Sequence, residues 1–272
     1  MASYRLIALD IDGTLLNSRK EVAPETADAI RQAVDAGKIV VFCTGRAVSE
    51  LEEFMATLPE IKYAVYASGA GLLDIPARRA FALRGIPRHL ADAVLAAVKG
   101  KDVMPQIVLP EKDVIQASHM AALEHFHMGI YRPLYERAMT LVPDIYAFAE
   151  TCREEMLKVN VYHADPLERV RTMERLAHLP LEKAYSEVSS LESSALGVNK
   201  GSGLLRLCEE LGVPREQCLA VGDADNDIPM LKAAGLGVAM GNANEAVRAA
   251  ADTVAADLDH GGCAQAIRLA LG

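Results

Sequence analysis

The sequence predicts an α/β protein built on a doubly wound parallel sheet, into which a second, α+β domain is inserted. Three observations support this prediction. Short apolar runs alternate with amphipathic helical stretches at both ends of the 272-residue chain. The runs are apolar throughout, as in parallel strands that are buried on both faces. A middle segment of roughly 110 residues, long enough for a domain of its own, interrupts the alternation.

The first part of the chain is predicted to form a β-α-β-α-β unit. The first helix is indicated by Pro24 near its start, by apolar residues spaced three or four apart, and by Gly37 placed to end it. The strands are predicted at residues 5–9, 39–42 and 63–67, and the helices at residues 24–36 and 48–58. Such short apolar runs with helices between them favour a parallel sheet.

The same alternation returns at the end of the chain. Helices are predicted at residues 201–211, 228–234, 245–250 and 263–271, and strands at 218–221, 236–239 and 253–255. We therefore expect one core domain from residues 1–83 and 195–272, and an inserted α+β domain from residues 84–194. In the insert, helices are predicted at 87–98, 120–127, 134–139 and 166–176, and strands at 103–109, 114–117, 156–162 and 183–188.

Composition and charge argue against several classes of protein. The chain has 28 Lys and Arg against 37 Asp and Glu, a net charge of −9, and no basic run, so a nucleic-acid partner is not expected. Its longest stretch without charged residues, 233–244, is too short to span a bilayer. No signal-like segment precedes Asp10, which predicts a cytoplasmic protein that does not bind membranes. The five dispersed cysteines predict reduced thiols.

Side chains able to hold a metal ion or a phosphate follow the predicted core strands. They are Asp10, Asp12 and Thr14 after the first strand, Thr44 and Gly45 after the second, Lys200 at the start of a helix, and Asp223, Asp225, Asn226 and Asp227 after the strand at 218–221. The carboxyl ends of parallel strands meet at one edge of a sheet, so these side chains should converge. Converging carboxylates need a cation, and oxygen ligands with room for water favour Mg²⁺.

This pattern predicts metal-assisted phosphoryl transfer. Lys200 and a small hydroxyl beside backbone amides suit a phosphate group. Asp10, at the tip of the first strand, is the predicted nucleophile, which would form an aspartyl-phosphate. A bend at Gly13 would bring Asp12 to the same phosphorus, where it would act as general acid and then as general base.

Four groups of residues resemble the ordered motifs of the haloacid dehalogenase superfamily of phosphatases. They are Asp10-x-Asp12-Gly13-Thr14, Thr44-Gly45-Arg46, Lys200, and Gly222-Asp223-x-x-Asn226-Asp227. The large insert and the run at residues 237–243 resemble the Cof-type subfamily with a type IIB cap. The resemblance implies a Rossmann-like core, an inserted cap domain that selects the leaving group, and Mg²⁺ as cofactor.

The resemblance also implies a role for each acidic residue. Asp10 and Asp223 would bind Mg²⁺ by their side chains. Asp12 would bind it by its backbone carbonyl. Asp227 would orient metal-bound water or Lys200.

The remaining motif residues would hold the phosphate. Thr44 and the amide of Gly45 would contact its oxygens, Lys200 would provide a counter-charge, and Asn226 would donate its side-chain amide. Ser68 stands where the family often has Asn, and Ser193 stands where an apolar residue is usual. Both departures could alter contacts with the leaving group.

The predicted function is therefore Mg²⁺-dependent hydrolysis of small phosphorylated metabolites, with sugar phosphates among the candidates. A phosphomutase of the same superfamily and a non-catalytic sensor of a phosphorylated ligand are the alternatives. Three histidines of the insert, His119, His125 and His127, are interpreted as structural or solvated residues, because their spacing suits no metal site.

Overall fold

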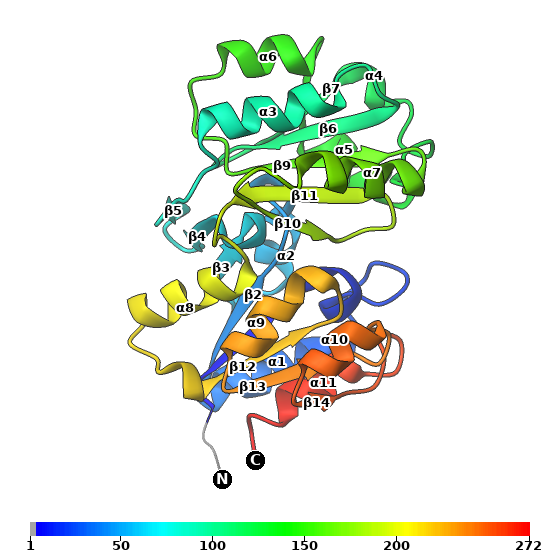
Figure 1. The fold of residues 1–272 in the computed structure, drawn as a ribbon. Coiled ribbons are helices and arrows are strands. Elements are labelled where there is room, and N and C mark those ends of the chain that lie inside the picture. Colours follow the sequence, from blue (N-terminus) through cyan, green and yellow to red (C-terminus); the bar gives the residue numbers. More distant parts are fainter. Residues whose placement is uncertain (1–3) are drawn as a thin grey trace. The chain divides into compact units, whose positions relative to one another are not determined.

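The computed structural model describes residues 4–272, which divide into two compact units. The core unit comprises the residues up to 45, 53–81 and 199–272, and the inserted unit comprises residues 46–52 and 82–198. Figure 1 shows the ribbon of both units. The short segment 46–52 lies in the part of the sequence predicted as core, yet its contacts group it with the inserted unit.

The core unit is built on an eight-stranded sheet with the order β14-β13-β12-β1-β2-β3-β4-β5. Its strands are β1 (Leu6–Leu9), β2 (Ile39–Cys43), β3 (Tyr63–Tyr66), β4 (Gly71–Asp74), β5 (Arg79–Phe81), β12 (Cys218–Gly222), β13 (Leu236–Ala239) and β14 (Thr253–Val254). The strands from β14 to β3 are parallel, which confirms the predicted fold class. All four residues of the central strand β1 are fully buried, as a sheet covered on both faces requires.

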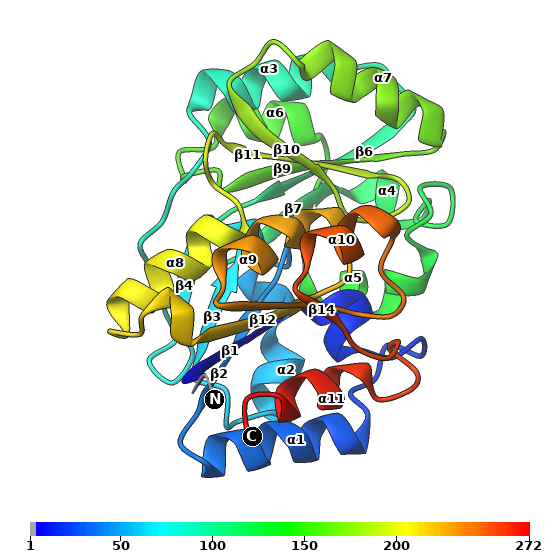
Figure 2. The same ribbon diagram turned by 60° about the horizontal axis from the view of Figure 1, so that its bottom comes forward.

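Helices cover both faces of this sheet. They are α1 (Pro24–Asp35), α2 (Glu52–Thr57), α8 (Lys200–Glu210), α9 (Ile228–Ala233), α10 (Glu245–Ala250) and α11 (Gly262–Arg268). Helices α1 and α11 pack together on one face, and α8 and α9 pack together on the other (Figure 2). The arrangement is that of a doubly wound sheet.

One predicted element of the core needs correction, and two strands were missed. The helix predicted at residues 48–58 is divided into a 3₁₀ turn, Val48–Glu50, and α2, and the side chain of Glu50 caps the start of the turn by accepting a hydrogen bond from the backbone N–H of Ala47. The antiparallel strands β4 and β5, which extend one edge of the sheet, were not predicted. Strands of three or four residues carry too little periodicity to be recognised.

The inserted unit contains a six-stranded sheet with the order β10-β11-β9-β6-β7-β8. Its strands are β6 (Val103–Val108), β7 (Asp113–Gln116), β8 (Met139–Val142), β9 (Lys158–His163), β10 (Leu181–Tyr185) and β11 (Ser190–Ala195), and its helices are α3 (Arg88–Val98), α4 (Ala117–Met120), α5 (Arg132–Ala138), α6 (Ile145–Thr151) and α7 (Pro166–Leu176). Helices α3 and α7 pack on one face, over apolar residues such as Val159, Val161 and Leu191.

The helix predicted at residues 120–127 is wrong. Helix α4 ends at Met120, and the chain continues through turns to His127, which has a left-handed backbone with φ of 60°. His125 contacts Asp102 at 2.9 Å, and His127 contacts the carbonyl of Ala164 at 3.0 Å. These contacts agree with the structural interpretation of the histidines.

The cysteines and the helices also bear on predictions from the sequence. The five cysteines are buried free thiols, as predicted. Within residues 4–272, none of the helices has both the length and the apolar character that crossing a membrane requires.

Candidate active site

Asp10 lies at the tip of the central strand β1 and is 4% exposed. Its backbone N–H donates to the carbonyl of Val221 at 3.0 Å, which continues the pairing of β1 with β12. The chain then turns at Gly13, whose φ is 80°. A Cβ atom at Gly13 would lie 2.2 Å from a carboxylate oxygen of Asp223, so this position needs glycine for its conformation and for its space.

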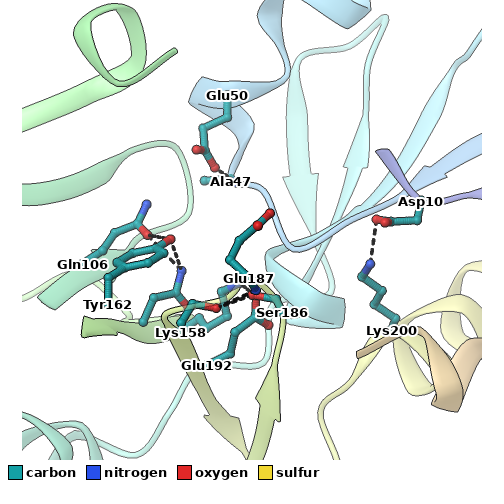
Figure 3. Close-up of polar contacts among 12 residues, drawn as sticks. Asp10, Ala47, Glu50, Gln106, Lys158, Tyr162, Ser186, Glu187, Glu192 and Lys200 are labelled. Atoms are coloured by element: carbon teal, nitrogen blue, oxygen red, sulfur yellow. Dashed lines mark hydrogen bonds and ion pairs between the residues drawn. The ribbon is translucent and has the colours of Figure 1, made fainter. Parts of the chain in front are cut away.

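Lys200 joins two of the acidic residues. It is the first residue of α8, it is 1% exposed, and its Nζ lies 2.6 Å from Oδ1 of Asp10 and 2.6 Å from Oδ1 of Asp227. Figure 3 shows the contact with Asp10. Burial alone would lower the pKa of Lys200, but the carboxylates of Asp10 and Asp227 raise that pKa well above its ordinary value. The buried side chain of Lys200 is therefore positively charged at neutral pH.

The loop after β12 is organised by Asp227. Its Oδ2 accepts hydrogen bonds from the backbone N–H groups of Asp223, at 2.9 Å, and Ala224, at 3.0 Å. Since its Oδ1 binds Lys200, both oxygens of Asp227 are engaged. Asp227 thus fixes the loop and Lys200 at the same time.

The carboxylate of Asp223 is held by two side chains. Oγ1 of Thr14 donates to its Oδ1 at 2.9 Å, and Nδ2 of Asn242 lies 3.3 Å from its Oδ2. The same Nδ2 donates to the carbonyl of Gly13 at 3.0 Å, and Oδ1 of Asn242 accepts from the N–H of Leu258. Asn242 therefore links Asp223 to the turn after β1.

The three carboxylates of Asp10, Asp223 and Asp227 have oxygen atoms within 4.8 Å of one another. Burial, with the charge of Asp227, raises the pKa of Asp10 well above its ordinary value and that of Asp223 to about 7. Three carboxylates face one ammonium group, so a divalent cation would offset the excess negative charge. Oxygen ligands of this kind fit a hard cation such as Mg²⁺.

The other predicted residues lie at the same strand ends. Thr44 follows β2 and is 1% exposed; its N–H donates to Val65, and its carbonyl accepts from the N–H of Ser68 at 3.0 Å. Gly45 is the next residue. Asn226 is buried, and its Oδ1 has no hydrogen-bond partner within the part of the chain that the structure describes. Buried polar atoms are usually hydrogen-bonded, so the amide of Asn226 is a candidate contact for a bound group.

Asp12 makes a contact that the sequence did not predict. Its Oδ1 lies 3.2 Å from Nζ of Lys20, which has a left-handed backbone with φ of 61° in the following loop. The contacts of Asn242 with Gly13 and Asp223 were also missed. The run at residues 237–243 pointed to the region of Asn242, whereas no pattern in the sequence pointed to Lys20.

Comparisons with known proteins identify the family of the chain. The family model of haloacid dehalogenase-like hydrolases matches residues 7–267. The chain is 31% identical over 277 residues to a pyridoxal phosphate phosphatase of Escherichia coli, with 93% of each chain covered. It is 29% identical over 265 residues to a 5-amino-6-(5-phospho-D-ribitylamino)uracil phosphatase of Bacillus subtilis, with 97% of this chain and 94% of the other covered.

The fold is also found in solved structures. A haloacid dehalogenase-like hydrolase from B. subtilis superimposes with a TM-score of 0.86 at 28% identity, covering 97% of this chain and 99% of the other. The family model spans nearly the whole chain, and the parallel sheet of the core unit agrees with the fold of that solved structure. The chain therefore belongs to the haloacid dehalogenase-like hydrolases, and it is a phosphatase of their Cof type.

Proposed function

We propose that the protein is a Mg²⁺-dependent hydrolase of the phosphate monoesters of small metabolites, and that it works through an aspartyl-phosphate intermediate. One observation carries the proposal. The buried carboxylate of Asp10 lies 2.6 Å from the ammonium of Lys200, inside a cluster of three carboxylates that suits a divalent cation. A carboxylate placed between two positive charges can attack an anionic phosphate ester, because these charges offset the repulsion.

Three groups would hold the metal: the carboxylates of Asp10 and Asp223 and the backbone carbonyl of Asp12. Bound Mg²⁺ would supply positive charge that polarises the phosphate and holds it beside Asp10. Asp227 already binds Lys200 and two backbone amides, so its role would be to keep Lys200 and the loop of Asp223 in place.

In the first step, a carboxylate oxygen of Asp10 attacks phosphorus, and the bond from phosphorus to the ester oxygen breaks. Asp12 gives its proton to the departing oxygen, which leaves as an alcohol. In the second step, Asp12 takes a proton from water, and that water attacks the phosphorus of the aspartyl-phosphate. The bond to Asp10 breaks, and phosphate and the free carboxylate result.

The phosphate itself would be held by the other strand-end residues. Thr44 and the N–H of Gly45 would donate to its oxygens, as would the side-chain amide of Asn226. Lys200 would neutralise charge that moves onto Asp10 and the phosphate during transfer.

The substrate class is supported by the relatives. The similar proteins named above are phosphatases of pyridoxal phosphate and of 5-amino-6-(5-phospho-D-ribitylamino)uracil, which are small phosphorylated molecules. We include sugar phosphates in the proposed range. The inserted unit, predicted at residues 84–194, would act as the cap that selects the leaving group. Location in the cytoplasm and the absence of a nucleic-acid partner stay predictions from the sequence.

The test is hydrolysis of p-nitrophenyl phosphate by the wild type and by Asp10→Asn, with Mg²⁺ and with a chelator. We expect phosphate release by the wild type with Mg²⁺ only, and loss of at least about three orders of magnitude in kcat for Asp10→Asn, because the amide is not a nucleophile. Circular dichroism should show that the variant keeps its fold. Equal rates for the two proteins would refute the assignment of Asp10. With a sugar phosphate as the substrate, an isomerised phosphosugar without free phosphate would favour a phosphomutase.

A further inference from the structure

The chain forms a tight hairpin at residues 16–22, directly after the turn that carries Asp12, and an antiparallel bridge joins the two ends of this hairpin. Asn17 organises it. Its side-chain Oδ1 accepts hydrogen bonds from the backbone N–H groups of Arg19 and Glu21, each at 3.0 Å, and its carbonyl accepts from the N–H of Lys20 at 2.9 Å. The hairpin therefore owes its conformation to its own hydrogen bonds.

Lys20 occupies a strained position in this hairpin. Its backbone is left-handed, with φ of 61°, a conformation that residues other than glycine rarely adopt. In this conformation its side chain reaches Asp12, with Nζ 3.2 Å from Oδ1 and the two side chains 29% and 23% exposed. Strained residues persist only where the surrounding structure holds them, and they cluster at functional sites. The strain at Lys20 thus points to a role for its ammonium group.

The group that Lys20 contacts belongs to the candidate active site. Asp12 stands between Asp10, at the tip of β1, and the turn at Gly13. Burial and then the charge of Asp227 raise the pKa of Asp223 most, and the charge of Asp12 adds to this effect, so the side chain of Asp12 lies near that of Asp223. In the proposed reaction the side chain of Asp12 transfers protons. The contact with Lys20 therefore falls on the proposed proton donor.

An ammonium group at this distance can act on Asp12 in two ways. A charge-assisted hydrogen bond to Oδ1 restricts rotation of the carboxyl group and so orients it. Negative charge also develops on the carboxyl group as its proton moves to the ester oxygen, and a neighbouring positive charge stabilises that development. Both effects matter only for esters whose leaving oxygen needs a proton as its bond to phosphorus breaks.

We propose that Lys20 is a positioning residue, which orients the side chain of Asp12 for transfer of its proton to the leaving oxygen. The inference rests on the proposed function, because it needs Asp12 to act as the general acid. It goes further in assigning a role to a residue outside the four motifs.

The experiment compares phenyl phosphate with p-nitrophenyl phosphate, two esters of similar shape. Nitrophenolate leaves readily without a proton, whereas phenolate is much more basic and benefits from one. We measure kcat/KM at saturating Mg²⁺, because this constant reports on the step in which the ester bond breaks. In Lys20→Met, which removes the charge and keeps the length, the ratio of kcat/KM for phenyl phosphate to that for p-nitrophenyl phosphate should fall about tenfold, part of the 100-fold or more that general acid catalysis contributes.

Three further variants make the comparison specific. Lys20→Arg keeps the charge and the donors, so its ratio should lie within about threefold of the wild type. Arg19→Met is the matched control, since it removes a positive charge from the same hairpin, where Arg19 is 77% exposed and pairs with Glu21. Its ratio should not change. Asp12→Asn should lower the ratio at least as much as Lys20→Met, and adding Lys20→Met to Asp12→Asn should have no further effect on it.

The outcomes separate this inference from the proposed function. A wild type that hydrolyses neither ester refutes the proposed function. An unchanged ratio in Asp12→Asn refutes the role of Asp12 as general acid, and the inference fails with it. If Asp12→Asn lowers the ratio but Lys20→Met slows both esters equally, or acts no differently from Arg19→Met, the inference alone is overturned. A further fall of the ratio when Lys20→Met is added to Asp12→Asn also overturns it, because Lys20 would then act independently of Asp12.

Discussion

At the scale of single residues, the geometry of the site depends on contacts that hold Asp223. Its two carboxylate oxygens are bound by Thr14 and Asn242. We predict that Asn242→Ala lowers the affinity for Mg²⁺ about tenfold or more, because a carboxylate that has lost an orienting partner binds a metal less well. Calorimetric titration of the free protein with Mg²⁺ measures this affinity without reference to activity.

Asn244→Ala is the control for that variant. Asn244 lies two residues away and caps α10, its Oδ1 accepting from the N–H of Val247 at 3.0 Å, and its Nδ2 binds Asp225. Its loss should lower the free energy of unfolding by about 1 kcal/mol and leave the Mg²⁺ affinity unchanged. Unchanged Mg²⁺ affinity in Asn242→Ala would show that Thr14 alone is enough to orient Asp223.

The sequence predicted the convergence of Asp10, Lys200 and Asp223 because one topological rule brings strand ends to the same edge of a parallel sheet. That rule uses only the order of strands and helices. It does not specify the conformations of the loops or the contacts that loop residues make. The contacts of Lys20 with Asp12 and of Asn242 with Gly13 depend on loop conformation, including a left-handed residue at Lys20, and no local pattern predicts them.

At the scale of elements, the position of Lys200 depends on how closely α8 approaches its neighbours. A Cβ atom at Gly203 would lie 2.6 Å from Cγ1 of Val65 and 2.7 Å from Cα of Gly69. In an exposed helix, Gly→Ala would stabilise by about 1 kcal/mol. Here we predict that Gly203→Ala lowers the free energy of unfolding by about 1 to 3 kcal/mol, since the clash with backbone atoms displaces the helix.

Denaturant unfolding followed by circular dichroism measures this effect. Glu209→Ala, on the exposed side of the same helix, should change the free energy of unfolding by less than about 0.5 kcal/mol. Stabilisation by Gly203→Ala would mean that α8 has room to move away from β3 without loss.

Elements were predicted well where they are long or repeat a clear pattern. Helix α7 was predicted with its bounds as found, because Pro166 starts it and the apolar spacing continues to Leu176. Strand β11, with the sequence Ser190–Ala195, was missed because three serines and a glutamate hide its alternation. Ser190, Glu192 and Ser194 share one face, and Ser193 lies on the opposite face beside the buried Leu191. With polar residues on both faces, the strand lacks the hydrophobic alternation by which strands are recognised.

At the scale of the whole molecule, the division into two units could be anticipated only in part. The change from strictly alternating elements to a mixed pattern indicated an insertion. The grouping of residues 46–52 with the inserted unit could not be anticipated, because it depends on contacts far apart in the sequence. Ser49, for example, donates from Oγ to Oδ2 of Asp113 at 3.3 Å.

Asp113 makes the stability of the molecule depend on pH. It is fully buried, and burial, followed by the charge of Glu50, raises its pKa well above the ordinary value, against the opposing effect of Lys158. The folded state therefore holds the Asp113 proton more tightly than the unfolded state does. The contribution to stability is complete below the ordinary pKa and is lost as the pH rises through the raised pKa of the folded state.

We therefore predict that Asp113→Asn stabilises the protein at neutral pH, by about 1 to 3 kcal/mol, because it removes a buried group that must either stay protonated or become charged. The amide oxygen can still accept the hydrogen bond from Ser49. The variant should also show a smaller loss of stability than the wild type between acidic and neutral pH. Urea unfolding at a series of pH values measures both effects, with the exposed Glu111→Gln expected to follow the wild type. If Asp113→Asn lowered stability at neutral pH, the carboxylate would have to be ionised and paired with Lys158 in the folded protein.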